Sequence, residues 1–367
     1  MPAFRIAVIP GDGVGSEIAA EAVKVITSAA ATFSFDAEFE PFDWGCDHYL
    51  EHGRMMARDA LQTLADFDAI FLGCIGDASK VPDHISLEML LAIRKGFDQY
   101  VNLRPIRLYP AVSTPVATAS PDTLDMVVVR ENTEGEYSGV GGIFKPGTPD
   151  AFALQTAVFT SKGCERVIRY AFETARRRAK LGSSGTVGRV TNCTKSNALG
   201  YSMVFWDEMF AAVAAGYADI ETDMALVDAM TMWLVKNPEY FDVIVASNLF
   251  GDIITDLGAM LQGGMGFAAG GNINPERTYP SMFEPIHGSA PKYAGQRRVN
   301  PIASIEAARM LIEHLGETDA AAGIQSAVER VLVAGEVRTA DMGGTATTDQ
   351  LGTAVAREIE KGPSHEH

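Results

Sequence analysis

The stretch FDVIVASNLFGDIITD, residues 241–256, joins an apolar strand to the start of a helix. Its first half, up to Ser247, is short, apolar and rich in β-branched residues, which is typical of a buried strand. Ser247 and Asn248 are residue types that cap helix N-termini, and a helical pattern follows them. A buried strand that continues into a helix is the repeating unit of α/β proteins.

The same alternation occurs along the rest of the chain. Three further apolar strands are predicted at Arg5–Pro10, Phe67–Gly73 and Met126–Arg130. Helical periodicity covers residues 17–31, 87–97, 163–179, 197–214 and 301–315. The chain of 367 residues is long for one core, and LGSSG at residues 181–185 is the nearest approach to a linker. We therefore predict an α/β fold with a largely parallel sheet and two or three domains.

The charge of the chain limits its partners. It carries 47 acidic and 30 basic residues, a formal net charge of −17. Such a surface repels nucleic acid and anionic membranes, so neither is an expected partner. An anionic small molecule can still bind where arginines and lysines converge.

Cysteine usage and the N-terminus predict a cytoplasmic protein. The four cysteines, at positions 46, 74, 164 and 193, form no CxxC pair, which favours reduced thiols. The N-terminus runs directly into an apolar strand without the pattern of a signal peptide. No apolar run approaches the ~18 to 20 residues of a membrane helix.

A glycine-rich loop, GDGVG at Gly11–Gly15, stands between the first strand and its helix. It is similar to the dinucleotide fingerprint, but its third glycine comes one residue too early. We favour the alternative, a tight strand-to-helix turn that needs positive φ angles.

Two aspartates form a candidate metal site. Asp252 and Asp256 are four residues apart on one helix face, with Cβ atoms about 5–6 Å apart. Carboxylates so placed repel each other unless a cation lies between them, and oxygen ligands suit Mg²⁺ or Mn²⁺. The alternative is a solvated acidic face at a helix N-terminus. The neighbours Ile253, Ile254 and Leu257 argue against an open surface, which favours the metal site.

Three arginines are candidates for binding carboxylates, because the guanidinium fork can hold a carboxylate through two hydrogen bonds. Arg94 and Arg104, taken singly, are better explained as surface or structural residues, and Arg130 is the exception. Arg130 ends a predicted strand, and open α/β sheets bind ligands at the carboxyl ends of their strands.

Two further side chains can transfer protons. Tyr137 lies in a polar, glycine-rich loop and is either a proton donor or a half-buried packing residue. Lys195 lies among small polar residues. Most lysines are solvated, but one beside a divalent cation has a lowered pKa and can act as a base.

Several segments resemble the β-decarboxylating dehydrogenase family, which contains the isocitrate and isopropylmalate dehydrogenases. They are NLFGDIITD (248–256), FEPIHGSAPKYAG (283–295), VNPIAS (299–304), NLRP (102–105) and VRENTEGEYSG (129–139). The resemblance runs from RIAVIPGDGVG (5–15) to ADMGGTATT (340–348), nearly the whole chain. PDHISL (82–87) and FDQYVNLRP (97–105) are most similar to the branch that acts on tartrate and D-malate.

The resemblance implies the isocitrate/isopropylmalate dehydrogenase-like fold, with two domains around a central cleft, and not a Rossmann fold. Residues 1–100 and 257–367 would form a large cofactor-binding domain. Residues 101–256 would form a smaller domain with the dimer interface and the substrate and metal residues. In a homodimer with shared active sites, Lys195 and Asp228 would reach the partner's cleft.

The implied activity is metal-dependent oxidative decarboxylation of a small 2-hydroxy dicarboxylic acid, with D-malate or tartrate favoured. Arg94, Arg104 and Arg130 match the residues that bind the substrate carboxylates. The matches to the metal ligands, base and acid are Asp228, Asp252, Asp256, Lys195 and Tyr137. The cation would be Mg²⁺ or Mn²⁺, and a monovalent cation such as K⁺ is compatible with the family.

The expected cofactor is NAD, with NADP as an alternative. The residues that match cofactor contacts are His287, Gly288, Ser289, Ala290, Lys292, Tyr293 and Asn300. Lys292 and Tyr293 resemble the pair that holds the 2′-phosphate in NADP-dependent relatives. Ala340 and Gly344 replace further phosphate-binding side chains, so this NADP signature is incomplete.

Two alternatives stay open from the sequence. Leu87, Leu90 and Leu91 allow an apolar wall for 3-isopropylmalate, whereas His84, Ser86 and Glu88 favour a smaller polar substrate. A non-catalytic regulatory subunit would be expected to lack some of the proton-transfer and metal residues, and this chain has them all.

Overall fold

The computed structural model describes residues 2–180 and 187–362, so the loop predicted at residues 181–185 lies outside the described residues. The chain forms two compact units. The terminal unit contains residues 1–99, 107–121 and 259–367, and the central unit contains residues 100–106 and 122–258. The cofactor-binding role expected of the large domain and the dimer, substrate and metal roles expected of the smaller one remain predictions.

The terminal unit contributes five neighbouring strands in the order β2-β1-β3-β12-β11. Their bounds are β1 (Ala3–Gly11), β2 (Asp36–Pro41), β3 (Ala69–Cys74), β11 (Ala269–Ile273) and β12 (Ser281–Pro285). The pairs β1–β2, β1–β3 and β3–β12 are parallel, while β11 and β12 are antiparallel. The prediction of a largely parallel sheet is therefore confirmed for this unit, with β11–β12 as the exception.

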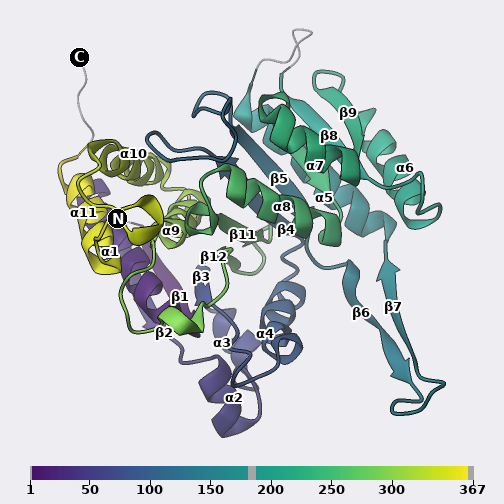
Figure 1. Cartoon of the computed structure of the whole chain (residues 1–367), viewed down its shortest axis with the longest axis horizontal. Coiled ribbons are helices and arrows are strands. Elements are labelled where there is room, and N and C mark those ends of the chain that lie inside the picture. The colour runs from purple at the N-terminus through teal and green to yellow at the C-terminus, as the bar shows by residue number, and fades with distance from the viewer. Residues whose placement is uncertain (1, 181–186, 363–367) are drawn as a thin grey trace. The chain divides into compact units, whose positions relative to one another are not determined.

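Helices pack on this sheet and on one another (Figure 1). They are α1 (Gly15–Phe33), α2 (Cys46–His52), α3 (Ala60–Leu64), α4 (Asp83–Gly96), α9 (Ile302–Leu315), α10 (Thr318–Ala334) and α11 (Thr348–Glu360). In α1 the buried residues Ile18, Ala22, Val25 and Ala29 recur every three or four positions, which makes one apolar face. Short 3-10 turns cover Met265–Phe267, Pro291–Tyr293 and Ala340–Met342.

The glycine-rich loop is the tight turn that the sequence favoured. Gly11 and Gly13 have φ angles of 71° and 59°. The backbone N–H of Val14 donates to the Ser289 carbonyl oxygen at 2.8 Å, and a Cβ on Gly13 would lie 2.0 Å from that oxygen. Asp12 accepts hydrogen bonds from the backbone N–H groups of Cys46 and Gly76. The loop is thus tied to its own unit, and glycine is required for this close approach.

The central unit contributes the strands β4-β5-β10-β8-β9 in that order. Their bounds are β4 (Val101–Arg107), β5 (Asp125–Glu131), β8 (Arg189–Thr194), β9 (Glu221–Leu226) and β10 (Val243–Ala246). The pairs β5–β10, β10–β8 and β8–β9 are all parallel. An antiparallel hairpin of β6 (Gly135–Phe144) and β7 (Phe152–Val158) forms a separate two-stranded sheet (Figure 1).

The helices of the central unit follow its strands along the chain. They are α5 (Ser161–Arg178), α6 (Ser202–Ala214), α7 (Val227–Lys236) and α8 (Asn248–Leu261), with a 3-10 turn at Pro238–Tyr240. The predicted junction between strand and helix at Asn248 is confirmed. The helix predicted over residues 197–214 begins only at Ser202, because turns occupy the residues after Lys195.

All four cysteines are buried and unbridged. Within residues 2–180 and 187–362, none of the helices has the length and apolarity to cross a membrane.

Candidate active site

The register of the central sheet brings the ends of four strands to one edge. Ala246 lies opposite Arg130 on one side and opposite Cys193 on the other. Because these strands are parallel, the residues that follow them leave the sheet at the same edge. This confirms the predicted position of Arg130 at a strand's carboxyl end and places it beside the start of α8.

Arg130 is buried and held by α8. Its side chain is 3% exposed. Nε and Nη2 donate to Asn248 Oδ1 at 3.1 and 2.7 Å, and Nη1 donates to Asp252 Oδ1 at 2.5 Å. The guanidinium also lies 5.6 Å from the centre of the Tyr137 ring.

Arg104, on β4, approaches the same helix turn. Its Nε donates to Asn102 Oδ1 at 2.7 Å and its Nη1 to Thr255 Oγ1 at 2.6 Å. Nη1 also lies 3.5 Å from Asp252 Oδ1 and 3.9 Å from Asp256 Oδ1. Two arginines therefore converge on the two predicted metal ligands, and two positive charges face two negative ones.

The aspartates are accessible to a ligand. The Asp252 and Asp256 side chains are 37% and 63% exposed. Burial raises the pKa of Asp256, Arg104 opposes this shift, and the charge of Asp252 adds to it. Ile253 is 52% exposed, so the expectation that apolar neighbours close off this face is wrong at that residue, which points away from the packed side of α8.

The donor set suits a hard divalent cation, since both side chains supply carboxylate oxygens that a cation can bridge. A third protein ligand does not join them within one chain: no group of three His, Cys, Asp or Glu side chains with metal-binding geometry occurs in the described parts of the chain. Asp228, the third predicted ligand, instead pairs with Lys195, whose Nζ lies 2.7 Å from Asp228 Oδ1. This ammonium lowers the pKa of Asp228.

Tyr137 belongs to the cluster around Asp252. Its hydroxyl donates to Asp252 Oδ2 at 3.1 Å. Tyr137 lies on β6, so its predicted position in a loop is wrong: the hairpin with β7 extends the strand over it. The turn before β6 is fixed by Glu131, whose carboxylate accepts the backbone N–H groups of Thr133 and Glu134. The structure thus brings together Arg104, Arg130, Tyr137, Asp252 and Asp256, and it pairs Lys195 with Asp228.

Arg94 lies in the terminal unit, on α4. Its Nη2 donates to Glu284 Oε1 at 2.9 Å, and both side chains are largely buried. Glu284 also accepts from Asn272 Nδ2 at 2.8 Å. The Nε of Arg94 is buried without a hydrogen-bond partner. A buried donor left unpaired is costly, so an anionic acceptor at this position would stabilise it.

The predicted cofactor loop is also in the terminal unit. His287 Nδ1 lies 3.0 Å from the Gly288 carbonyl oxygen, and Nε2 is buried without a partner. Burial lowers the pKa of His287, which favours the neutral ring. The Ser289 hydroxyl donates to the Gly76 carbonyl oxygen, and Ala290 adopts a φ angle of 42°. An unsatisfied ring nitrogen in a loop with strained backbone is consistent with a binding loop.

Cationic groups gather around Tyr293. Lys292 Nζ lies 4.7 Å from the centre of the Tyr293 ring, and the Arg298 guanidinium lies 5.4 Å from it. Asn300 is largely buried and donates to Asp341 Oδ2 at 3.1 Å. Lys292 and Arg298 are exposed, so both are available to an anionic ligand.

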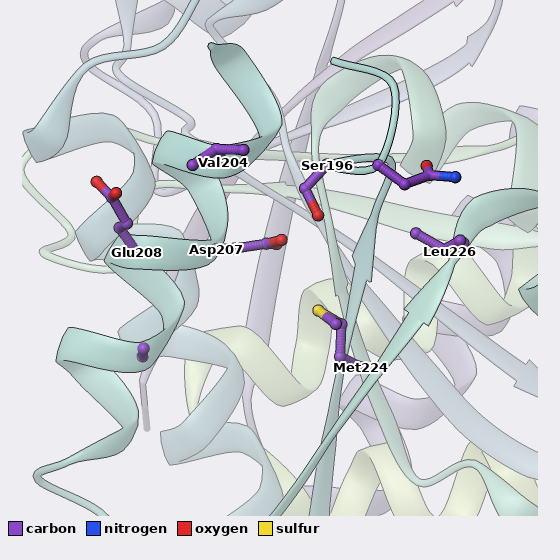
Figure 2. Close-up of a pocket in the computed structure, with 8 residues that line it drawn as sticks. Ser196, Val204, Asp207, Glu208, Met224 and Leu226 are labelled. Carbon is purple, nitrogen blue, oxygen red and sulfur yellow. The ribbon is translucent and has the colours of Figure 1, made fainter. Parts of the chain in front are cut away.

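A pocket of about 640 Å³ lies apart from this chemistry, between α6 and β9. Figure 2 shows the side chains of Asp207 and Met224 pointing into it. Its lining residues are Ser196, Asn197, Val204, Asp207, Glu208, Ala211, Met224 and Leu226. This lining has two carboxylates and no cation, so it does not suit an anionic acid.

Sequence reasoning missed two kinds of residue. The first are the residues that accept hydrogen bonds from the arginines, and the second is Arg298, the other cation beside the cofactor loop. Asn248 and Thr255 lie on the same helix as the aspartates, so their spacing was a usable signal. Glu284 is in the FEPIHGSAP segment, but its distance of 190 positions from Arg94 hides their pairing. Arg298 follows the loop directly and could have been included with Lys292.

An α/β fold that gathers buried arginines, carboxylates and a tyrosine around the helix that follows a parallel strand has the constellation of an enzyme acting on a small anionic molecule. The chain belongs to the isocitrate/isopropylmalate dehydrogenase family, whose profile matches residues 5–355. The predicted family and dehydrogenase class are thereby confirmed.

Individual relatives agree with this membership. The chain is 46% identical over 366 residues to D-malate dehydrogenase [decarboxylating] of Escherichia coli (strain K12), covering 98% of this chain and 99% of that protein. It is 45% identical to tartrate dehydrogenase/decarboxylase of Pseudomonas putida, covering 98% and 100%. The crystal structure of isocitrate dehydrogenase from Methylococcus capsulatus superposes with a TM-score of 0.87 at 34% identity, covering 97% and 99%. The predicted isocitrate dehydrogenase-like fold is confirmed.

Proposed function

We propose that this chain catalyses metal-dependent, NAD(P)-linked oxidative decarboxylation of a small 2-hydroxy dicarboxylic acid, D-malate or tartrate. The observation that carries the proposal is the convergence of Arg104 and Arg130 on Asp252. Two of the relatives with full-length similarity are named for D-malate and tartrate, and both names include decarboxylation.

Charge balance supports a dicarboxylate as the ligand. Arg104 and Arg130 offset Asp252 and Asp256 in the central unit, and Arg94 is offset by Glu284 in the terminal unit. A bound divalent cation would add two positive charges and the two carboxylates of the acid would add two negative charges. The net charge of the site would therefore stay the same. Arg94, Arg104 and Arg130 would then donate to the substrate carboxylates, with Arg94 Nε gaining the acceptor that it lacks.

Asp252 and Asp256, with Asp228 of a second copy, would hold Mg²⁺ or Mn²⁺. Such a cation, when bound, supplies Lewis-acid polarisation of the hydroxyl and carbonyl oxygens. The aspartates' own contribution is to keep two partly exposed carboxylates on one helix face.

Two residues of the chain would move protons. Lys195 would take the proton of the C2 hydroxyl, and the hydrogen on C2 would leave with two electrons, as a hydride, to a nicotinamide. Tyr137 would protonate C3 once the C3 carboxylate has left as CO₂. Its hydrogen bond to Asp252 holds the hydroxyl beside the proposed metal ligands.

The cofactor would lie on the loop of His287, Gly288, Ser289 and Ala290, with Asn300 nearby. Lys292, Tyr293 and Arg298 would meet the adenosine ribose. Two exposed cations there would bind the 2′-phosphate of NADP, while NAD is expected from the motifs of the related branch. We therefore propose that both cofactors are used.

A homodimer with shared active sites would account for the positions of Lys195 and Asp228. They pair with each other, away from Asp252 and Asp256. Met232 and Trp233, on the same helix as Asp228, are 72% and 46% exposed, as expected for an interface face. We also propose a cytoplasmic location, because all four cysteines are unbridged.

The side chains of α4 leave both substrate classes open. Of the leucines that could form an apolar wall, Leu90 packs into the core of the terminal unit, but Leu87 is 37% exposed. His84 and Glu88 are exposed on the same helix, while Ser86 is buried. The preference for D-malate or tartrate over 3-isopropylmalate therefore rests on the named relatives.

A substrate panel tests the proposal. D-malate, both tartrates, 3-isopropylmalate and isocitrate are compared by kcat/KM with Mn²⁺ and either nicotinamide. We expect D-malate or a tartrate to exceed 3-isopropylmalate and isocitrate by at least about 100-fold. A clear preference for isopropylmalate, or no turnover of any acid, would contradict it.

A further inference from the structure

Asn248 and Gly251, which the proposed roles leave unused, both contact Arg130. Asn248 is 1% exposed, and its Oδ1 accepts both Nε and Nη2 of Arg130. Gly251 lies one helical turn further on in α8. A Cβ at this position would meet Cγ, Cβ and Cδ of Arg130 at 2.5, 2.7 and 3.0 Å.

A glycine inside a helix is less favourable than alanine, so its presence calls for a packing reason. The aliphatic part of Arg130 occupies the space that a side chain would take. Asp252 Oδ1 accepts a hydrogen bond from Nη1 of Arg130. Asn248, Gly251 and Asp252 therefore hold both the aliphatic stem and the guanidinium of Arg130.

The amide of Asn248 also reaches the turn before β6, the strand that carries Tyr137. Its Nδ2 donates to the Glu134 carbonyl oxygen at 3.0 Å. Gly135, the first residue of β6, has a φ angle of 70°, and a Cβ there would lie 3.2 Å from Asn248 Cβ. Asn248 therefore connects Arg130, the start of β6 and α8.

An amide suits this position better than a carboxylate. It accepts two N–H groups and donates one without adding charge, so Asn248 adds no negative charge beside the ion pair of Arg130 with Asp252. An aspartate at 248 would place a second carboxylate against Arg130 and stand four residues from Asp252, where like charges repel.

We propose that Asn248 and Gly251 are positioning residues that fix the guanidinium of Arg130 for the substrate carboxylate. This inference rests on the proposed function, in which Arg130 binds that carboxylate. Removing either constraint is expected to weaken substrate binding even when the fold is kept.

The test measures the Kd of D-malate by calorimetry with the full chain and Mg²⁺, without nicotinamide, so that no turnover occurs. Asn248→Ala is expected to raise Kd about 10- to 100-fold, the loss for hydrogen bonds to a charged group. In the double variant Asn248→Ala with Arg130→Lys, Kd should stay within about threefold of that for Arg130→Lys alone. The reason is that both substitutions remove the same interaction, the one between Asn248 and Arg130. Independent structural damage would give additive losses.

Gly251→Ala is the second variant, and Gly258→Ala is its matched control. Gly258 is on the same helix, and a Cβ there would lie 2.2 Å from Ile106 Cδ1. Both alanines are expected to lower Tm, but only Gly251→Ala should raise Kd by about tenfold or more. Circular dichroism identifies variants that remain folded.

Two results overturn the inference in distinguishable ways. If Arg130→Lys weakens D-malate binding while Asn248→Ala and Gly251→Ala do not, the positioning role is wrong and the proposed function stands. If Arg130→Lys leaves Kd unchanged, the assignment of Arg130 fails and the inference fails with it.

Discussion

The hydroxyl of Tyr137 donates a hydrogen bond to Asp252 Oδ2 at 3.1 Å, while Oδ1 of the same carboxylate accepts from Arg130. One aspartate thus connects the proposed proton donor, a proposed substrate arginine and the proposed metal site. Asp252 is able to do this because α8 begins directly beside the strand end that carries Arg130.

The proton-transfer roles are separable by partial reactions. Lys195→Met should abolish oxidation of D-malate, because the hydroxyl proton has no acceptor. Tyr137→Phe should slow protonation of the enol of pyruvate more than it slows reduction of oxaloacetate. Stopped-flow absorbance and decarboxylation of added oxaloacetate measure these steps. Equal losses in every partial reaction for both variants would show that the roles are not divided in this way.

Chelation should remove activity reversibly. EDTA is expected to abolish turnover and Mn²⁺ or Mg²⁺ to restore it. Asp252→Asn should raise the Mn²⁺ concentration for half-maximal rate by at least about tenfold, since one charged ligand is lost. Asp219→Asn is the control, because Asp219 is also paired with an arginine, Arg176, at 2.6 Å. Full activity after exhaustive chelation would refute the metal assignment.

Cofactor preference should depend on Lys292. We expect the kcat/KM values for NAD and NADP to lie within about two orders of magnitude. Lys292→Asp should shift the ratio strongly towards NAD, because a carboxylate repels the 2′-phosphate and accepts from the ribose. Arg298→Ala should shift it in the same direction, and the exposed Lys162→Asp should not. An unchanged ratio in Lys292→Asp would mean that this side chain does not face the cofactor.

Acid should remove a stabilising contribution of Asp125. Burial opposes ionisation of this carboxyl, but Arg178 and Lys180 outweigh burial and lower its pKa. A lowered folded-state pKa gives stability that is present above the unfolded-state value and is lost as pH falls through the folded-state value. Asp125→Asn should therefore cost about 1 kcal/mol of unfolding free energy near pH 7, after solvent screening, and progressively less below pH 4. Urea denaturation of the two proteins near pH 7 and below pH 4 measures the difference in their unfolding free energies. A difference that is the same at both pH values would contradict the prediction.

Local sequence patterns predicted the elements whose causes are local. The strand that ends before Asn248, the helix that begins there and the positive φ angles of Gly11 and Gly13 follow from residues within one segment. Pairings between distant segments do not. Nothing near Arg94 indicates Glu284, and Gly251 reads as a weak helix residue until Arg130 is seen against it. The late start of α6 at Ser202 shows that apolar periodicity alone does not detect a turn.

The proposed reaction is tested most directly by product stoichiometry. Purified protein is incubated with D-malate, Mn²⁺ and NAD, and reduced nicotinamide, CO₂ and pyruvate are measured together. The proposed activity predicts the three in equal amounts, with oxaloacetate not accumulating. Reduced nicotinamide that forms with oxaloacetate but without CO₂, or the absence of reduced nicotinamide and CO₂ from D-malate and from both tartrates, would contradict it.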